Sequence, residues 1–166
     1  FHALRCKVGF VLQHADDQLF FPTVLEDVAF GPLNLGFSAA EAEEQARATL
    51  QRLGLSGFEQ RLTHHLSGGE KKLVALATVL AMEPEALLLD EPTNDLDQDA
   101  RQRLIDILCD LPTALMVISH DWDFLSRVCG EYRTIREGHL LACAPDVRHS
   151  HEHVHPLGLE PHWHLP

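Results

Sequence analysis

Three short apolar segments, separated by longer helical segments, restrict this chain to one class of fold. The segments cover residues 8–12, 86–89 and 114–118 and contain no charged or polar side chain. Strands without alternating polar residues are typical of parallel sheets that are buried between layers of helices. We therefore predict an α/β fold, in which a parallel sheet carries helices on both faces.

Helix starts are marked by Ser or Thr followed three residues later by Glu, the pattern of a capping box. The three pairs are Thr23/Glu26, Ser38/Glu41 and Ser67/Glu70. They predict helices over residues 24–30, 39–53 and 68–82, the first of which we expect Gly31-Pro32 to end. Asp97 is predicted to cap a helix over residues 98–109. Residues 131–142 are predicted to form a hairpin that turns at Glu137-Gly138.

The charge and the cysteine pattern exclude several classes of protein. The chain has 25 Asp and Glu residues against 13 Lys and Arg, a formal net charge of −12. Such a surface repels phosphate backbones, so we do not expect nucleic acid as a partner. The longest apolar run, residues 73–82, is shorter than the roughly 18 residues that span a bilayer. Four scattered cysteines without a CxxC pair indicate a reduced, cytosolic protein.

Polar residues follow each predicted strand at its carboxyl end, where parallel sheets bind their ligands. They are Gln13 after the first strand, Asp90 and Glu91 after the second, and Ser119, His120 and Asp121 after the third. Asp90 can hold Mg²⁺, while Glu91 can orient and deprotonate an attacking water. Each residue alone is also explained as a polar strand end, but their occurrence at three strand ends favours a metal–phosphate site.

The segment Leu66-Ser67-Gly68-Gly69-Glu70 places two glycines at a predicted helix start. Exposed backbone N–H groups and the helix dipole favour an anion there, and the Ser67 hydroxyl can donate to a phosphate. A capping box before a core helix explains Ser67 and Glu70. It does not explain the two glycines, which lower helix stability.

The motifs of this chain, and the order in which they occur, resemble those of ABC-transporter ATPase domains over about residues 5–142. The matching segments are Gln13, LSGGE at 66–70, LLLDEP at 87–92, NDLD at 94–97 and SHD at 119–121. The resemblance implies that ATP is bound by the Q-loop glutamine, the signature loop and the D-loop aspartate, which are Gln13, Ser67, Gly68, Gly69, Glu70 and Asp97. It makes Asp90 the Walker B aspartate, with Gln13 a further Mg²⁺ ligand. Glu91 becomes the catalytic glutamate and His120 the switch histidine.

The same resemblance implies a partial domain over residues 1–143, with a RecA-like sheet and a helical subdomain at about 23–82. A P-loop needs Gly-x-x-x-x-Gly-Lys-Ser/Thr, but none of the three lysines follows a glycine. In the family the P-loop lies upstream of the Q-loop. We therefore expect an N-terminally truncated chain that lacks the first strands, leaves one side of its sheet uncovered and is inactive alone.

Residues 16–32 resemble those of energy-coupling-factor and cobalt/nickel import ATPases. This implies an ATPase that powers import of cobalt or nickel from the cytoplasmic face of the cell membrane. Its implied partners are an integral-membrane subunit, which the segment after the Q-loop contacts, and a second ATPase subunit, identical or different. For Phe20, Phe21 and Phe30 in that segment, core packing is the alternative.

Residues 144–166 are predicted to be a disordered tail that holds half of the twelve histidines. These are His149, His151, His153, His155, His162 and His164. Imidazole suits Ni²⁺, Co²⁺ and Zn²⁺, so the tail is a candidate transition-metal site, with a solvated low-complexity segment as the alternative.

Two other functions compete with the importer ATPase. A DNA-repair or chromosome ATPase shares several motifs, but it inserts a long coiled coil between Q-loop and signature loop. Here Gln13 and Ser67 are only 54 positions apart, which excludes that class. A non-catalytic regulatory or metal-sequestering remnant of an ATPase stays open, supported by the missing P-loop.

Overall fold

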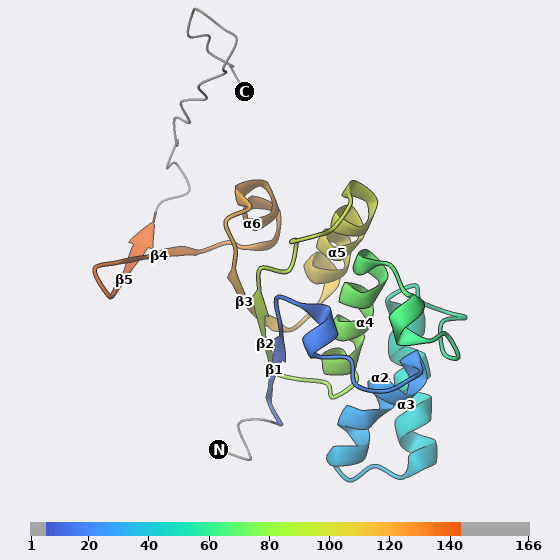
Figure 1. Ribbon diagram of the computed structural model, residues 1–166. Helices are drawn as coiled ribbons and strands as arrows, with labels where there is room; N and C mark the ends of the chain where they lie inside the picture. The colour runs from blue at the N-terminus through green and yellow to red at the C-terminus, as the bar shows by residue number, and fades with distance from the viewer. Residues whose placement is uncertain (1–5, 144–166) are drawn as a thin grey trace, which may run out of the picture. The chain divides into compact units, whose positions relative to one another are not determined.

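A three-stranded parallel sheet with its helices forms the first of two compact units, which are divided after Gly130. The computed structural model describes residues 6–143. The elements of the first unit, shown in Figure 1, are β1 (Val8–Val11), the 3-10 helix η1 (Ala15–Asp17), α2 (Val24–Asn34), α3 (Ala39–Arg52), the 3-10 helix η2 (Thr63–His65), α4 (Gly68–Leu80), β2 (Ala86–Asp90), α5 (Gln98–Asp110), β3 (Ala114–Ile118) and α6 (Trp122–Val128).

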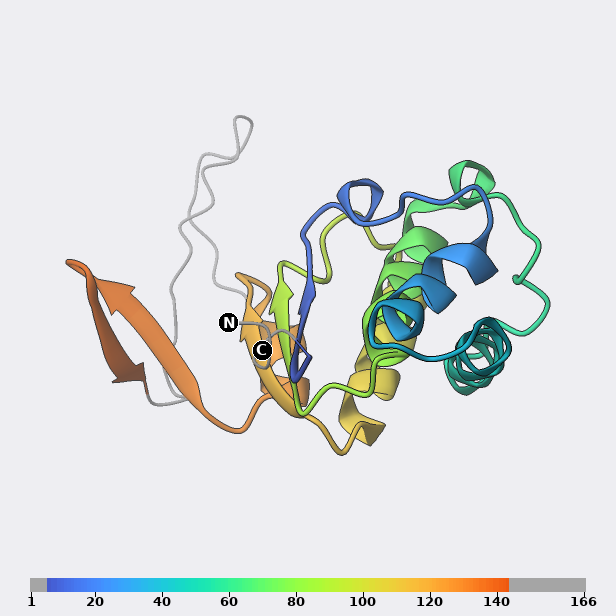
Figure 2. The same ribbon diagram turned by 90° about the horizontal axis from the view of Figure 1, so that it is seen from below.

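The strands lie in the order β1-β2-β3, all parallel, so the carboxyl ends of all three meet at one edge. Leu88 pairs with Phe10 on one side and with Met116 on the other. Figure 2 shows the three strands side by side, with α4 facing them from one side. All three strands and the predicted α/β class are confirmed.

One face of the sheet packs against α4. Val11, Leu87 and Leu89 on this face are buried. Gly9 allows the close approach, since a Cβ at this position would lie 2.1 Å from Val79 Cγ1. On the opposite face Phe10 and Met116 are exposed, Met116 by 58%. Within the first unit this face of the sheet is therefore uncovered at Phe10 and Met116.

All three capping boxes form as predicted, at the starts of α2, α3 and α4. At α3, for example, the Ser38 amide donates to Glu41 Oε2 over 2.8 Å. A cap of this kind stabilises a helix by about 1 kcal/mol, and it depends only on residues three positions apart. The helix starts could therefore be predicted from local sequence alone.

The prediction that Gly31-Pro32 ends the first helix was wrong, because α2 continues to Asn34. Part of the clash between a proline and the residue before it involves the Cβ of that residue, and Gly31 has none. Met82 fills the vacant space, since a Cβ at Gly31 would lie 2.6 Å from Met82 Cγ. Helix α6 was not predicted at all, although its cap is visible: Asp121 Oδ1 accepts from the Phe124 amide at 3.0 Å.

The second unit contains the predicted hairpin, made of β4 (Tyr132–Arg136) and β5 (His139–Cys143). Glu137 and Gly138 both have positive φ angles, 51° and 79°, as a two-residue type I′ turn requires. The histidine-rich segment from residue 144 lies outside the described residues. Its disorder, its metal site and the domain boundaries therefore stay predictions. In the described part of the chain, no helix combines the length and apolar character needed to cross a membrane.

Candidate active site

Glu91 lies at the carboxyl edge of the sheet, one residue beyond β2. Its amide donates to the Ile118 carbonyl over 2.8 Å, so the pairing with β3 continues past the last strand residue. Its φ of 42° is a left-handed conformation that a non-glycine residue rarely adopts and that costs about 1–3 kcal/mol. The chain turns sharply here, while the Glu91 carboxylate stays anchored to β3.

The turn after β3 holds both carboxylate oxygens of Glu91. His120 Nδ1 lies 3.0 Å from Glu91 Oε1, and Ser119 Oγ donates to Oε2 over 3.2 Å. The Asp121 amide in turn donates to Ser119 Oγ over 3.1 Å. The hydrogen bond and the charge of Glu91 raise the pKa of His120. The predicted catalytic pair is thus in direct contact, in an arrangement that favours the imidazolium.

Asp90 fits the Mg²⁺ role that its position suggests. Its half-buried carboxylate forms no hydrogen bond or ion pair with another described residue, so both oxygens can accept a cation. Residues 6–143 hold no cluster of three or more His, Cys, Asp or Glu side chains around one point. Mg²⁺ is usually bound by one or two carboxylates, with waters and phosphates completing the shell. A carboxylate such as Asp90, with no hydrogen bond or ion pair to another described residue, is compatible with that need.

Lys72 is a cation beside this site that the sequence analysis did not assign to it. It is only 4% exposed, and its Nζ donates to the Gln13 carbonyl. Burial lowers the pKa of Lys72, against the opposing charges of Asp95, Asp90 and Glu91. The sequence contains a sign of this burial, because Lys72 is followed by Leu-Val-Ala-Leu and so lies in the apolar part of a predicted helix. Since Lys72 bonds the Gln13 carbonyl and interacts with Asp90 and Glu91, the backbone of Gln13 lies near these two carboxylates.

The LSGGE loop forms the start of α4 and packs against the start of α5. The Ser67 amide donates to Glu70 Oε2 over 2.8 Å, which completes the capping box. A Cβ at Gly69 would lie 2.8 Å from Ala100 Cβ, whereas one at Gly68 would meet only the Asp95 carbonyl at 3.6 Å. Gly69 therefore has a packing reason for being glycine.

No hydrogen bond between described residues joins the LSGGE loop to Glu91 or His120. The structure brings Glu91 and His120 into contact. Asp97 lies at the start of α5, where its Oδ1 accepts from the Ala100 amide over 2.8 Å and caps the helix.

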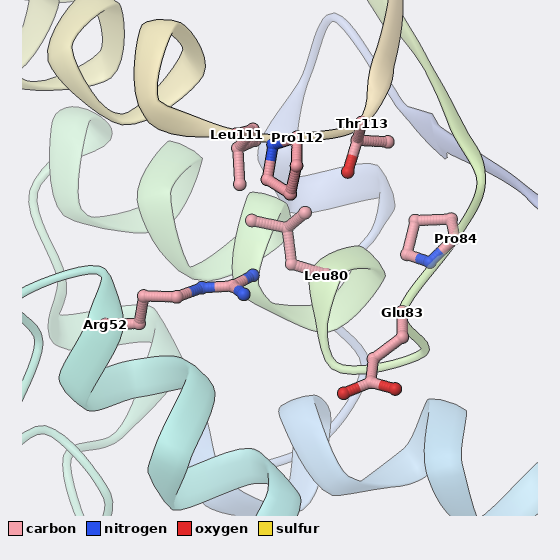
Figure 3. A pocket seen from close by; sticks show the side chains of 7 residues that line it. All are labelled: Arg52, Leu80, Glu83, Pro84, Leu111, Pro112 and Thr113. Carbon is pink, nitrogen blue, oxygen red and sulfur yellow. The ribbon is translucent and has the colours of Figure 1, made fainter.

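A shallow pocket of about 300 Å³ lies elsewhere, at the opposite edge of the sheet (Figure 3). Its lining residues are Arg52, Leu80, Glu83, Pro84, Leu111, Pro112 and Thr113. Pro84 and Thr113 precede β2 and β3, so the pocket is at the amino ends of these strands. The carboxylates and His120 lie at the carboxyl ends. The pocket is not part of the candidate active site.

Comparison with known proteins agrees with this geometry. A family model described as "ABC transporter" matches residues 1–94, which include Gln13, the LSGGE loop and Glu91. The chain belongs to the ABC transporter family. An ABC transporter ATP-binding protein of Nitratidesulfovibrio vulgaris is 59% identical over 162 residues, covering 98% of this chain and 59% of that protein.

Two further similar proteins are named for transport systems. The energy-coupling factor transporter ATP-binding protein EcfA of Methanothermobacter thermautotrophicus is 49% identical, covering 84% of this chain and 46% of EcfA. The structure of cbiO1 from Clostridium perfringens, part of the ABC transporter complex cbiONQ, matches with a TM-score of 0.76 and 35% identity. It covers 84% of this chain and 57% of cbiO1. The chain thus spans roughly half of each relative.

Proposed function

We propose that this chain is the catalytic part of an ATP-hydrolysing subunit of an ABC importer, with Glu91 as general base and His120 as the switch residue. One observation carries the proposal: Glu91 is held at the end of β2 by Ser119 and His120. A carboxylate anchored on both oxygens keeps one orientation, as a base that must meet a particular water requires.

The proposed chemistry uses the contacts already described. Glu91 orients the attacking water and accepts its proton as the water attacks the terminal phosphate. The His120 ring contacts Glu91 through Nδ1, which leaves Nε2 free to donate to a phosphate oxygen. Asp90 and the Gln13 amide would hold Mg²⁺, which when bound offsets the charge on the phosphate oxygens.

The signature residues Ser67–Glu70 and Asp97 serve a second ATP site in this proposal. No hydrogen bond between described residues joins them to Glu91, which agrees with a loop that closes over ATP held by another ATPase subunit. The 166 residues contain no P-loop pattern, so the triphosphate must be cradled by a P-loop outside them. The second subunit can be identical or different.

We further propose that the transported substrate is a transition-metal ion, cobalt or nickel, and that the chain acts at the cytoplasmic face of the membrane. Its similarity to EcfA and to cbiO1 of the cbiONQ complex supports this. The segment before α2 is the proposed contact with the membrane subunit. Phe20 in this segment is 75% exposed, whereas Phe21 packs against Phe30 at 5.0 Å between ring centroids.

Replacing Glu91 by Gln tests the proposal. The experiment uses a chimera that joins the segment upstream of the Q-loop in the Nitratidesulfovibrio vulgaris relative to this chain. By the family's order of motifs, that segment is expected to supply a P-loop. Glu91→Gln should lower ATP hydrolysis by about 10²-fold or more and leave ATP binding nearly unchanged, because only the proton acceptor is lost.

Glu85→Gln is the matched control, since Glu85 precedes β2 at the opposite edge and pairs with Lys7. Its hydrolysis rate should equal that of the unmodified chimera. Near-normal turnover in Glu91→Gln would remove Glu91 from the role of base. Absence of hydrolysis from the unmodified chimera, despite ATP binding, would favour a non-catalytic protein instead.

A further inference from the structure

Arg101 joins α5 to the turn that carries His120. Its Nε donates to Asp121 Oδ2 and its Nη2 to Asp121 Oδ1, both over 2.9 Å. Nη2 also reaches Asp123 Oδ2 at 2.7 Å. A guanidinium bound to both oxygens of a carboxylate fixes its orientation as well as its position, which a lysine cannot do. Arg101 lowers the pKa of Asp121, so this carboxylate stays ionised at neutral pH.

Asp121 transmits this restraint to the catalytic pair. Its backbone amide donates to Ser119 Oγ, which itself donates to Glu91. Its side chain also caps α6 through the Phe124 amide. An unbroken series of contacts therefore runs from Arg101 through Asp121 and Ser119 to the Glu91 carboxylate. His120 lies between Ser119 and Asp121 in the sequence, so the same turn carries it.

We propose that Arg101 is a positioning residue for ATP hydrolysis: it holds Asp121 so that the turn after β3 keeps His120 and Ser119 against Glu91. This inference rests on the proposed roles of Glu91 and His120. The neighbouring residue, Ala100, packs against Gly69 of the LSGGE loop. The start of α5 thus contacts both the signature loop and the switch turn, and Arg101 makes the second of these contacts.

The pKa of His120 distinguishes positioning from a simple charge effect. Loss of a nearby positive charge would by itself raise this pKa, since a cation disfavours the imidazolium. Loss of the contact with Glu91 would lower it, because Glu91 is the main stabiliser of the charged ring. The two explanations therefore predict shifts of opposite sign.

The experiment is an NMR titration of His120 in the 166-residue chain, with the resonance assigned by its loss in His120→Gln. The pKa of His120 in Glu91→Gln is the reference for a lost interaction between His120 and the Glu91 carboxylate. Arg101→Met should lower the pKa of His120 toward this reference, whereas Arg101→Lys, which keeps the charge and one donor, should lower it less. Arg127→Met is the control, because Arg127 also links α6 to α5, through Gln102 at 2.8 Å, without touching Asp121.

An unchanged or raised pKa of His120 in Arg101→Met would overturn the proposal. If Arg101→Met does not fold, Arg101→Lys decides, and an unchanged pKa there would overturn it equally. The titration needs no ATP, so it tests Arg101 even if the protein proves not to hydrolyse ATP. In the chimera, Arg101→Met should lower kcat by about 10- to 100-fold with ATP affinity unchanged, and Arg101→Lys should recover part of the loss.

Discussion

At the scale of single residues, Asp27 is a buried carboxylate in an environment that is unfavourable for its charge. It is buried in the first turn of α2, and its Oδ1 accepts from the amides of Phe20 and Phe21 at 2.8 and 3.1 Å. Its other oxygen, Oδ2, has no hydrogen-bond partner. Burial raises the pKa of this carboxyl group. Asp27 thus shapes the segment that presents Phe20, at a cost in stability when it is charged.

We predict that Asp27→Asn flattens the pH dependence of stability. A group whose pKa is higher in the folded state stabilises that state below its unfolded pKa, about 3.9, and this contribution is lost as pH rises through the folded pKa. The variant should therefore gain free energy of unfolding relative to the parent between pH 4 and pH 7. Urea unfolding at both values measures it, and a constant difference would contradict the pKa direction.

At the scale of elements, the contact between α4 and α5 depends on Gly69 but not on its neighbour Gly68. A Cβ at Gly69 meets Ala100 Cβ at 2.8 Å, and the two helix starts would have to separate. At Gly68 there is room for the extra methyl group, since the nearest atom is 3.6 Å away. The two neighbouring positions thus give a matched pair of substitutions.

We predict that Gly69→Ala destabilises the chain by about 1–3 kcal/mol relative to Gly68→Ala. Both substitutions gain the same helix propensity, so their difference isolates the steric contact. Urea unfolding gives the free energies. Equal stabilities would mean that α4 and α5 adjust freely at this contact.

The histidine-rich segment is predicted to bind metal as a separate element. The chain should bind Ni²⁺ or Zn²⁺ at pH 7.5 and release it below pH 6, because metal needs neutral imidazole, whose pKa is about 6.5. A version ending at residue 148 serves as control for isothermal calorimetry. Equal binding by both versions would place the metal elsewhere.

At the scale of the whole molecule, the described residues contain the proposed catalytic pair, Glu91 and His120, and the LSGGE loop. Most of the binding energy for a triphosphate comes from P-loop amides and their lysine. In the proposed function Glu91 acts on the terminal phosphate, and the LSGGE loop serves a second ATP site. The open side of the sheet, with Phe10 and Met116, favours self-association of isolated chains.

We predict that the 166-residue chain binds ATP–Mg²⁺ more weakly than the chimera by at least about 10²-fold. The reason is the missing P-loop pattern within these residues. Equilibrium dialysis of both proteins makes the comparison. Micromolar binding by the chain alone would show that its phosphate site lies elsewhere.

Local sequence predicted the strands, the capped helix starts and the order of the chemical groups, although it missed α6 and the end of α2. Thr23, Ser38 and Ser67 start helices because their partners are three residues away, and the apolar strands place Gln13, Asp90 and His120 at one edge of the sheet. Such features depend on short separations along the chain. A parallel sheet then orders the strand ends without further information.

Tertiary structure decided which groups hold one another. Arg101 meets Asp121 and Lys72 meets Gln13 across separations of 20 and 59 residues. Helix α2 continues through Gly31-Pro32, and Met82 fills the space beside the glycine. No local pattern specifies these partners, since each depends on how α4 and α5 pack on the sheet and on each other. Sequence alone thus determined which groups are present, and packing determined their positions.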